Sequence, residues 1–165
     1  MRTDDKKNTS RKPVSEETAF SRMARICSMR EYAAWDITQK LRRMNLADDA
    51  VSRVVKKLKS AKYIDDDRFA RSFISDKLRF DKWGRLKIEF ALRQKQIPQE
   101  VIGEAFGEFT DCQLKGGLTQ LIENKLKTVR GASEYEKRNK VIRYAVGRGF
   151  AIDEILGCLI NTKND

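Results

Sequence analysis

The sequence predicts an all-α protein made of tandem three-helix units, with about nine helices in an elongated, curved array. Helix-breaking residues are rare, since only 2 prolines and 9 glycines occur among 165 residues. Residues with β-branched side chains form no alternating runs, so strands have little support. Apolar residues recur instead at the i, i+3, i+4 and i+7 spacing of an amphipathic helix, as in Val51, Val54, Val55 and Leu58.

The apolar pattern occurs three times along the chain, in residues 41–55, 92–106 and 145–159. Each segment carries a bulky apolar residue five positions after its start, and these residues are Leu46, Ile97 and Phe150. Further apolar residues follow ten and fourteen positions after each start. A pattern that recurs at a near-constant period indicates one structural unit repeated in tandem.

The period of the pattern sets the expected domain boundaries. We expect a disordered tail over residues 1–14 and three-helix repeats over 15–63, 64–110 and 111–165. A unit of this size buries little apolar surface by itself, so the repeats should stack on one another.

In the first repeat, Ser15 should cap a helix that ends near Cys27. A second helix is expected over 31–43. A third is expected over 50–62, with Asp48 or Asp49 as its cap. In the third repeat we expect the first helix to start near Gln113 and the last helix to start within Ala151–Asp153. The pair Gly116–Gly117 should mark an irregular helix or a loop.

In the second repeat, one of the three aspartates at 65–67 should cap a helix whose buried face includes Phe69 and Ala70. Gly84 should break the chain before a helix over 85–95. That helix has apolar residues on more than one side, which suits a position between neighbours. Pro98 should lie in the first turn of the next helix, where its missing N–H costs nothing.

The sequence carries few residue types that catalysis or metal binding needs. It contains no histidine, which excludes histidine bases, histidine metal sites and histidine-containing triads. Its 3 cysteines have no C-x-x-C spacing, and no glycine-rich phosphate loop is present. We therefore expect a binding protein without a metal, a cofactor or an enzymatic activity.

No apolar stretch approaches the roughly 20 residues that a membrane span needs, and the polar N-terminus is unlike a secretory signal. The widely spaced cysteines Cys27, Cys112 and Cys158 fit free thiols in a reducing compartment. These features predict a cytoplasmic protein, and the mixture of basic and acidic faces predicts a monomer.

The net charge of +11 predicts a polyanionic partner, although charge also serves solubility. Residues 1–63 carry a net +8, residues 64–110 carry zero and residues 111–165 carry +3. The basic residues could form a stripe of the kind that binds a phosphate backbone, or a solvated face. No helix-turn-helix spacing suggests reading of bases. The candidate binding residues are Arg42, Arg43, Arg53, Lys56, Lys57, Lys59, Arg79, Lys82, Arg85, Lys87, Arg93, Lys95, Arg143 and Arg148.

Three motifs resemble those of the RecX family of regulatory proteins. The central one is the string Tyr63-Ile64-Asp65-Asp66-Asp67-Arg68-Phe69-Ala70. The second starts at Gly84-Arg85-Leu86-Lys87-Ile88 and continues to Leu92, Lys95 and Ile97. The third is Arg148-Gly149-Phe150. The chain departs from the family at Ala61–Lys62, where a glycine is common, and residues 112–130 align poorly.

The resemblance implies three tandem three-helix repeats and a role in DNA repair, recombination and the SOS response. RecX proteins bind the RecA recombinase, usually on its filament on single-stranded DNA, and restrain filament growth and RecA activities. No catalytic residue carries over. The motif residues that resemble the family are interpreted as fold-forming, and they are Tyr63, Ile64, Asp65, Asp66, Phe69, Ala70, Gly84, Ile97, Gly149 and Phe150.

Two other functions stay open at this stage. The chain could be a sequence-nonspecific DNA-binding module without an obligatory protein partner, whose affinity would fall steeply with salt. It could also be a helical adaptor for another acidic protein. Whether RecA would be inhibited or stimulated does not follow from the residues.

Overall fold

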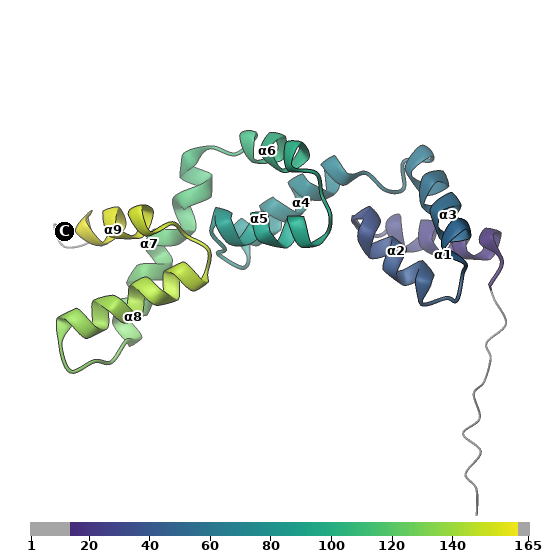
Figure 1. Cartoon of the computed structure of the whole chain (residues 1–165). Coiled ribbons are helices and arrows are strands. Elements are labelled where there is room, and N and C mark those ends of the chain that lie inside the picture. The colour runs from purple at the N-terminus through teal and green to yellow at the C-terminus, as the bar shows by residue number, and fades with distance from the viewer. Residues whose placement is uncertain (1–13, 162–165) are drawn as a thin grey trace, which may run out of the picture. The chain divides into compact units, whose positions relative to one another are not determined.

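A computed structural model describes residues 14–161 of the chain and contains α-helices but no strand within that range (Figure 1). This confirms the predicted all-α class. The helices are α1 Glu16–Cys27, α2 Ala34–Arg42, α3 Asp48–Ser60, α4 Asp66–Arg79, α5 Arg85–Gln94, α6 Gln99–Gly107, α7 Asp111–Thr128, α8 Glu134–Gly147 and α9 Ile152–Asn161.

The chain divides into two compact units, one up to Asp65 and one from Asp66 onwards. Unit 1 contains α1–α3, and α3 packs against both α1 and α2. Its core is centred on Ile37, Leu41 and Leu58, which are fully buried. The predicted disordered tail lies outside the described residues except for Val14, which packs against this core.

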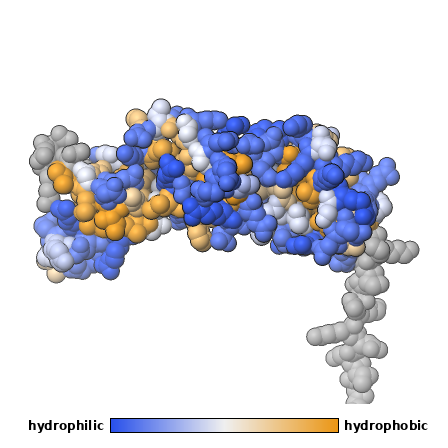
Figure 2. Space-filling model, turned by 45° about the horizontal axis from the view of Figure 1, so that its top comes forward, coloured by the Kyte–Doolittle hydropathy of each residue, from blue (hydrophilic) through white to orange (hydrophobic). Residues whose placement is uncertain are grey.

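Unit 2 contains α4–α9. Helix α4 packs against α6, while α7 packs against both α8 and α9. Contacts between α4 and α7 join the two groups of helices. Ile122, Val141 and Ile155 are fully buried in the core that α7, α8 and α9 share. Figure 2 shows a mostly hydrophilic face, on which hydrophobic residues gather mainly over α7–α9.

Side-chain caps explain where some helices begin. The Ser15 hydroxyl accepts a hydrogen bond from the Thr18 N–H at 3.2 Å, as predicted. Thr110 and Gln113 form a reciprocal capping box at the start of α7. The prediction for α3 is wrong, because Ala47 holds the cap position and makes no side-chain cap bond. Asp48 and Asp49 lie in the first turn, where their charges favour the helix dipole.

Other local predictions are corrected by the tertiary structure. Helix α2 begins at Ala34, three residues later than expected, and Pro98 is the N-cap of α6 and not part of its first turn. The Gly116–Gly117 pair lies inside α7 and does not break it. Tertiary packing therefore overrides local helix signals at these positions.

The apolar residues of α5 were expected to contact neighbours on more than one side. Ile88 and Leu92 are fully buried, whereas Leu86 is 56 % exposed and Phe90 is 61 % exposed. One apolar face of α5 therefore packs in the core, and the prediction fails for the other face.

The repeat also appears in the backbone, at the residue before each matched apolar position. Asn45, Gln96 and Gly149 all have positive φ, at 58°, 58° and 93°. After α5, the Ile97 N–H donates to the Leu92 carbonyl at 3.2 Å, which is the long bond of a Schellman motif. After α8, the Phe150 N–H donates to the Ala145 carbonyl at 3.3 Å. The same turn thus directs a bulky apolar residue into the core after both helices.

Two glycines bring the loop before α5 against the loop before α9 in unit 2. The Gly84 N–H donates to the Arg148 carbonyl at 2.8 Å, and the Leu86 N–H donates to the Gly149 carbonyl at 3.1 Å. A Cβ on Gly84 would overlap the Gly149 carbonyl, and a Cβ on Gly149 would overlap Lys87. The glycines of two of the predicted motifs therefore permit one backbone contact.

Candidate nucleic-acid interface

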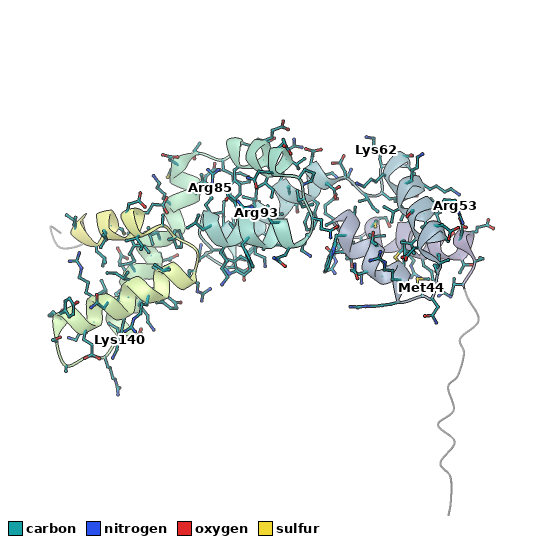
Figure 3. The ribbon with its side chains drawn as sticks, viewed as in Figure 1. Met44, Arg53, Lys62, Arg85, Arg93 and Lys140 are labelled. Atoms are coloured by element: carbon teal, nitrogen blue, oxygen red, sulfur yellow. The ribbon has the colours of Figure 1, made fainter. Side chains whose placement is uncertain are left out.

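The predicted basic residues differ in what they contact, and Arg53 is engaged within unit 1. Its guanidinium donates to the Glu16 carboxylate at 2.5 Å and to Asp49 at 2.9 Å (Figure 3). The bond to Glu16 joins α3 to the first turn of α1, whereas the bond to Asp49 lies within α3. The hydrogen bond from Arg53 lowers the pKa of the Glu16 carboxyl, and a second one lowers the pKa of Asp49.

Arg85 and Arg93 of α5 (Figure 3) both bind the carboxylate of Glu89, at 2.9 Å and 3.3 Å. The Glu89 side chain is only 14 % exposed, so the two arginines compensate a carboxylate that is largely removed from water. Arg93 also donates to the Gln99 amide at 3.0 Å. The Arg85 guanidinium lies 4.7 Å from the centre of the Phe106 ring. Both arginines therefore hold α5 in place.

Three further predicted residues make contacts within unit 2. Lys87 donates to the Gly147 carbonyl at 3.3 Å and lies 4.5 Å from the centre of the Trp83 ring. Lys95 lies 5.7 Å from the Phe69 ring. Arg143 donates to the carbonyl of its own helix at Asn139, at 3.4 Å. Of these, Lys87 and Lys95 connect segments that are distant in the sequence, whereas the Arg143 bond is local.

In unit 1, several basic residues line a groove of about 440 Å³ between α2 and α3, which we call the α2–α3 groove. Lys56, Lys59 and Arg42 contribute positive charge, and Arg42 pairs with Asp48 at 3.1 Å. Both partners of that pair are largely exposed, so it contributes little to stability. The remaining lining residues are Thr38, Val51, Ser52, Val55 and Ser60.

The structure separates residues that are adjacent in the sequence. Lys57 does not line the α2–α3 groove; its ammonium lies 4.5 Å from the centre of the Phe20 ring. Arg43 is exposed at the end of α2. The run of lysines at 56–59 therefore faces two directions, as helical geometry requires for neighbouring residues.

In unit 2, a hollow of about 510 Å³ lies where the end of α4 and the following turn meet α7 and α8; we call it the α7–α8 hollow. Two predicted residues, Lys82 and Arg148, meet here with Lys125, which was not predicted. The Arg79 guanidinium lies 5.6 Å from the Phe80 ring, which also lines the hollow. The other lining residues are Asp81, Gln120, Leu121, Asn124, Thr128 and Tyr144.

The hollow has a basic balance of charge. Its one acidic lining residue, Asp81, already forms an ion pair with Lys77 at 2.8 Å. The Arg148 guanidinium donates to the Asp81 carbonyl and to the Tyr144 hydroxyl, both at 3.2 Å. Lys125 lies 4.7 Å from the Tyr144 ring. Positive groups from three separate segments therefore converge on one site.

Sequence reasoning missed Lys125, Phe80 and Tyr144 because no local signal marks them. Lys125 lies in α7, over residues whose motif match is weak, and it meets Arg148 only through the packing of α7 on α8. Of the candidate binding residues, Lys82 and Arg148 line the hollow.

Among the described residues, no group of three histidine, cysteine, aspartate or glutamate side chains could hold a metal ion. None of the helices within residues 14–161 is both long and apolar enough to cross a membrane.

Two family models match the chain, and both describe parts of RecX. Residues 65–105 match the second three-helix domain of RecX, and residues 118–159 match the third. Together these ranges cover half of the chain. The chain belongs to the RecX family. Its membership accounts for the motifs at 63–70, 84–97 and 148–150, and the family is one of regulatory proteins.

Relatives named regulatory protein RecX match most of the chain. The protein of Prosthecochloris aestuarii is 29 % identical over 84 % of this chain and 93 % of its own length. That of Bacillus licheniformis is 26 % identical over 88 % of this chain but only 56 % of its own length. RecX relatives therefore differ considerably in length.

Solved RecX structures have the same fold. One crystal structure of regulatory protein RecX has a TM-score of 0.78 at 27 % identity, over 84 % of this chain and 70 % of that one. RecX from Lactobacillus salivarius also has a TM-score of 0.78, at 20 % identity, over 91 % of this chain and 97 % of that one. These similarities support the helical repeat fold, while the repeat boundaries near 63 and 110 stay predictions.

Proposed function

We propose that this RecX-family protein binds RecA and its nucleoprotein filament on single-stranded DNA. In this proposal it inhibits filament extension, ATP hydrolysis and strand exchange, as a cytoplasmic monomer. It acts by binding and not by catalysis, and so serves DNA repair, recombination and the SOS response. Membership of a regulatory family is the observation that carries the proposal.

The charged surface supplies a physical reason for such binding. Lys56 and Lys59 line the α2–α3 groove, and Lys82, Lys125 and Arg148 line the α7–α8 hollow. Phosphates of a filament, and acidic patches of RecA, would be attracted to both sites. Arg53 pairs with Glu16 and Asp49, and Arg85 and Arg93 share the carboxylate of Glu89.

The ATPase of RecA on single-stranded DNA tests the proposal. RecA from the same organism would be assayed while this protein is titrated in at amounts far below the RecA concentration. We expect the rate to fall, because one bound molecule can block the growth of a long filament. An unchanged rate, together with salt-sensitive binding to naked DNA, would favour a plain DNA-binding module instead.

A second test addresses the α2–α3 groove. Changing Lys56 and Lys59 to glutamate should weaken inhibition of RecA, because it reverses two charges on one groove. Lys57→Glu is the matched control, since Lys57 lies on the same helix but against the Phe20 ring. Circular dichroism would establish that each variant stays helical. Full inhibition by the folded double variant would remove the groove from the proposal.

A further inference from the structure

The α7–α8 hollow is lined by three positive residues, Lys82, Lys125 and Arg148, and by a single acidic one, Asp81. Lys125 and Arg148 both lie over the ring of Tyr144, at 4.7 Å and 5.4 Å. The one carboxylate on the wall, that of Asp81, is paired with Lys77. Both cations line the same hollow, so an anion bound there would interact favourably with both.

The Arg148 guanidinium has a fixed orientation in which it can bind such an anion. Its guanidinium bonds to the Asp81 carbonyl and the Tyr144 hydroxyl fix its orientation, and its own carbonyl accepts from the Gly84 N–H at 2.8 Å. A guanidinium has five N–H donors in a planar fork that matches phosphate oxygens. Because these two bonds use only part of the donor capacity of Arg148, N–H groups are left for a ligand.

Lys82 reaches the same site along α7. It has a φ of 51°, and a Cβ placed on Gly117 would lie 3.4 Å from the Lys82 Cδ. The Lys82 side chain therefore packs against α7 beside Gly117. This packing places a third ammonium or guanidinium group at the hollow.

An exposed aromatic ring adjoins these charges. Phe80 is 74 % exposed although it is a large apolar side chain, and Arg79 lies over its ring at 5.6 Å. Polar side chains of α7 continue the wall, namely Gln120, Asn124 and Thr128. Cations combined with an exposed ring form the pattern of single-stranded nucleic-acid sites, where phosphates meet the charges and bases stack on the ring. An acidic protein segment would supply negative charge but no base to stack on the Phe80 ring.

We propose that the α7–α8 hollow binds a single-stranded nucleic acid directly. A backbone phosphate lies between Lys82, Lys125 and Arg148, and a neighbouring base stacks on Phe80. A volume of about 510 Å³ accommodates a ligand of this size. The inference rests on the proposed function in one respect, namely that the bound strand is the one inside a RecA filament. Binding of the strand to the hollow does not itself require RecA.

Fluorescence anisotropy of a labelled oligothymidylate with the full chain, without RecA, tests the charges. We expect Lys82→Gln combined with Lys125→Gln to weaken binding about tenfold, and the slope of log affinity against log salt to become shallower by about 1.4. The control is Lys115→Gln combined with Lys127→Gln, which removes the same charge from other positions of α7. It should change affinity less than twofold.

Phe80→Ala tests the ring separately. Because Phe80 is exposed, its loss should leave the fold intact, as a thermal melt would establish. We expect at least about fivefold weaker binding with an unchanged salt slope, since stacking and not charge is removed.

The outcomes separate this inference from the proposed function. Unchanged DNA binding in both the double-lysine variant and Phe80→Ala overturns the inference. If those variants instead lose only the inhibition of RecA, the hollow contacts protein and the inference fails while the proposed function stands. If the wild-type chain leaves RecA unaffected yet binds DNA through the hollow, the proposed function fails and the inference stands.

Discussion

At the scale of single residues, turns with a left-handed residue help to determine this fold. Gln96, Asn45, Lys62 and Lys82 adopt left-handed conformations although none is a glycine. The conformation of Lys62 explains why a glycine is common at this turn in the family. The φ of Lys62 is 60°, and the following Tyr63 N–H donates to the Leu58 carbonyl at 3.0 Å. A glycine is favoured there because the conformation strains any residue with a Cβ.

Gln96→Gly should stabilise unit 2 by about 1 kcal/mol, because it relieves the strain of a left-handed residue with a Cβ. Chemical denaturation of both proteins measures the difference. Gln94→Gly is the matched control, since Gln94 is the last residue of α5, and it should destabilise by up to about 1 kcal/mol. A destabilised Gln96→Gly variant would contradict the argument.

Gly149→Ala should destabilise unit 2 by about 3 kcal/mol. The new methyl group would overlap Lys87, and the φ of 93° is unfavourable for alanine. Gly103→Ala provides the comparison: it lies within α6, nothing lies within 4 Å of its added Cβ, and it should be neutral or stabilising. Equal effects of the two changes on the melting temperature would refute the importance of the Gly84–Gly149 contact.

At the scale of elements, two ion pairs link the first and last helices of a group. Arg53 of α3 binds Glu16 of α1, and Arg71 of α4 binds Glu108 at the end of α6 at 2.6 Å. The sequence spacing is 37 residues in both cases. The periodicity of apolar residues did not predict these pairs, because they depend on how helices cross and not on their local pattern.

The Arg53 pairs predict a dependence of stability on pH. Hydrogen bonding to Arg53 lowers the pKa of Glu16 below its ordinary value of 4.5 in the folded state. The resulting stabilisation is present above that value and is lost as the pH falls below it, since the unfolded chain takes up the proton first. We expect Glu16→Gln to reduce this loss in urea titrations between about pH 6 and pH 3.

Glu17→Gln is the control for that experiment, because it removes the same charge from the same turn without removing a bond to Arg53. High salt should diminish the Glu16 effect, since both partners are partly exposed. An acid dependence identical in Glu16→Gln and the wild type would show that the pair contributes nothing.

The helices themselves could largely be predicted from the sequence. Apolar spacing predicted the buried face of α3 at Val51, Val54 and Leu58, and Ser15 predicted the start of α1. The start of α3 and the continuity of α7 through Gly116–Gly117 could not be predicted, because tertiary packing stabilises backbone that local propensity disfavours. The α7–α8 hollow could not be predicted, because its lining residues come together only through the packing of α7 and α8.

At the scale of the whole molecule, the chain has separate cores in its two units. Ile37 is fully buried in the core of unit 1, so Ile37→Ala should cost about 2–5 kcal/mol there. Hydrogen exchange should then accelerate in α1–α3 and stay unchanged in α7–α9. Acceleration throughout the described chain would contradict separate cores.

We propose that this RecX-family protein recognises the RecA filament and not simply DNA. Its affinity for a RecA filament held on single-stranded DNA by a non-hydrolysable ATP analogue should be compared with its affinity for the same naked strand, at one salt concentration. We predict clearly tighter binding to the filament, because RecA adds contacts to those of the phosphates. Equal or weaker binding to the filament would contradict the account and leave a DNA-binding module.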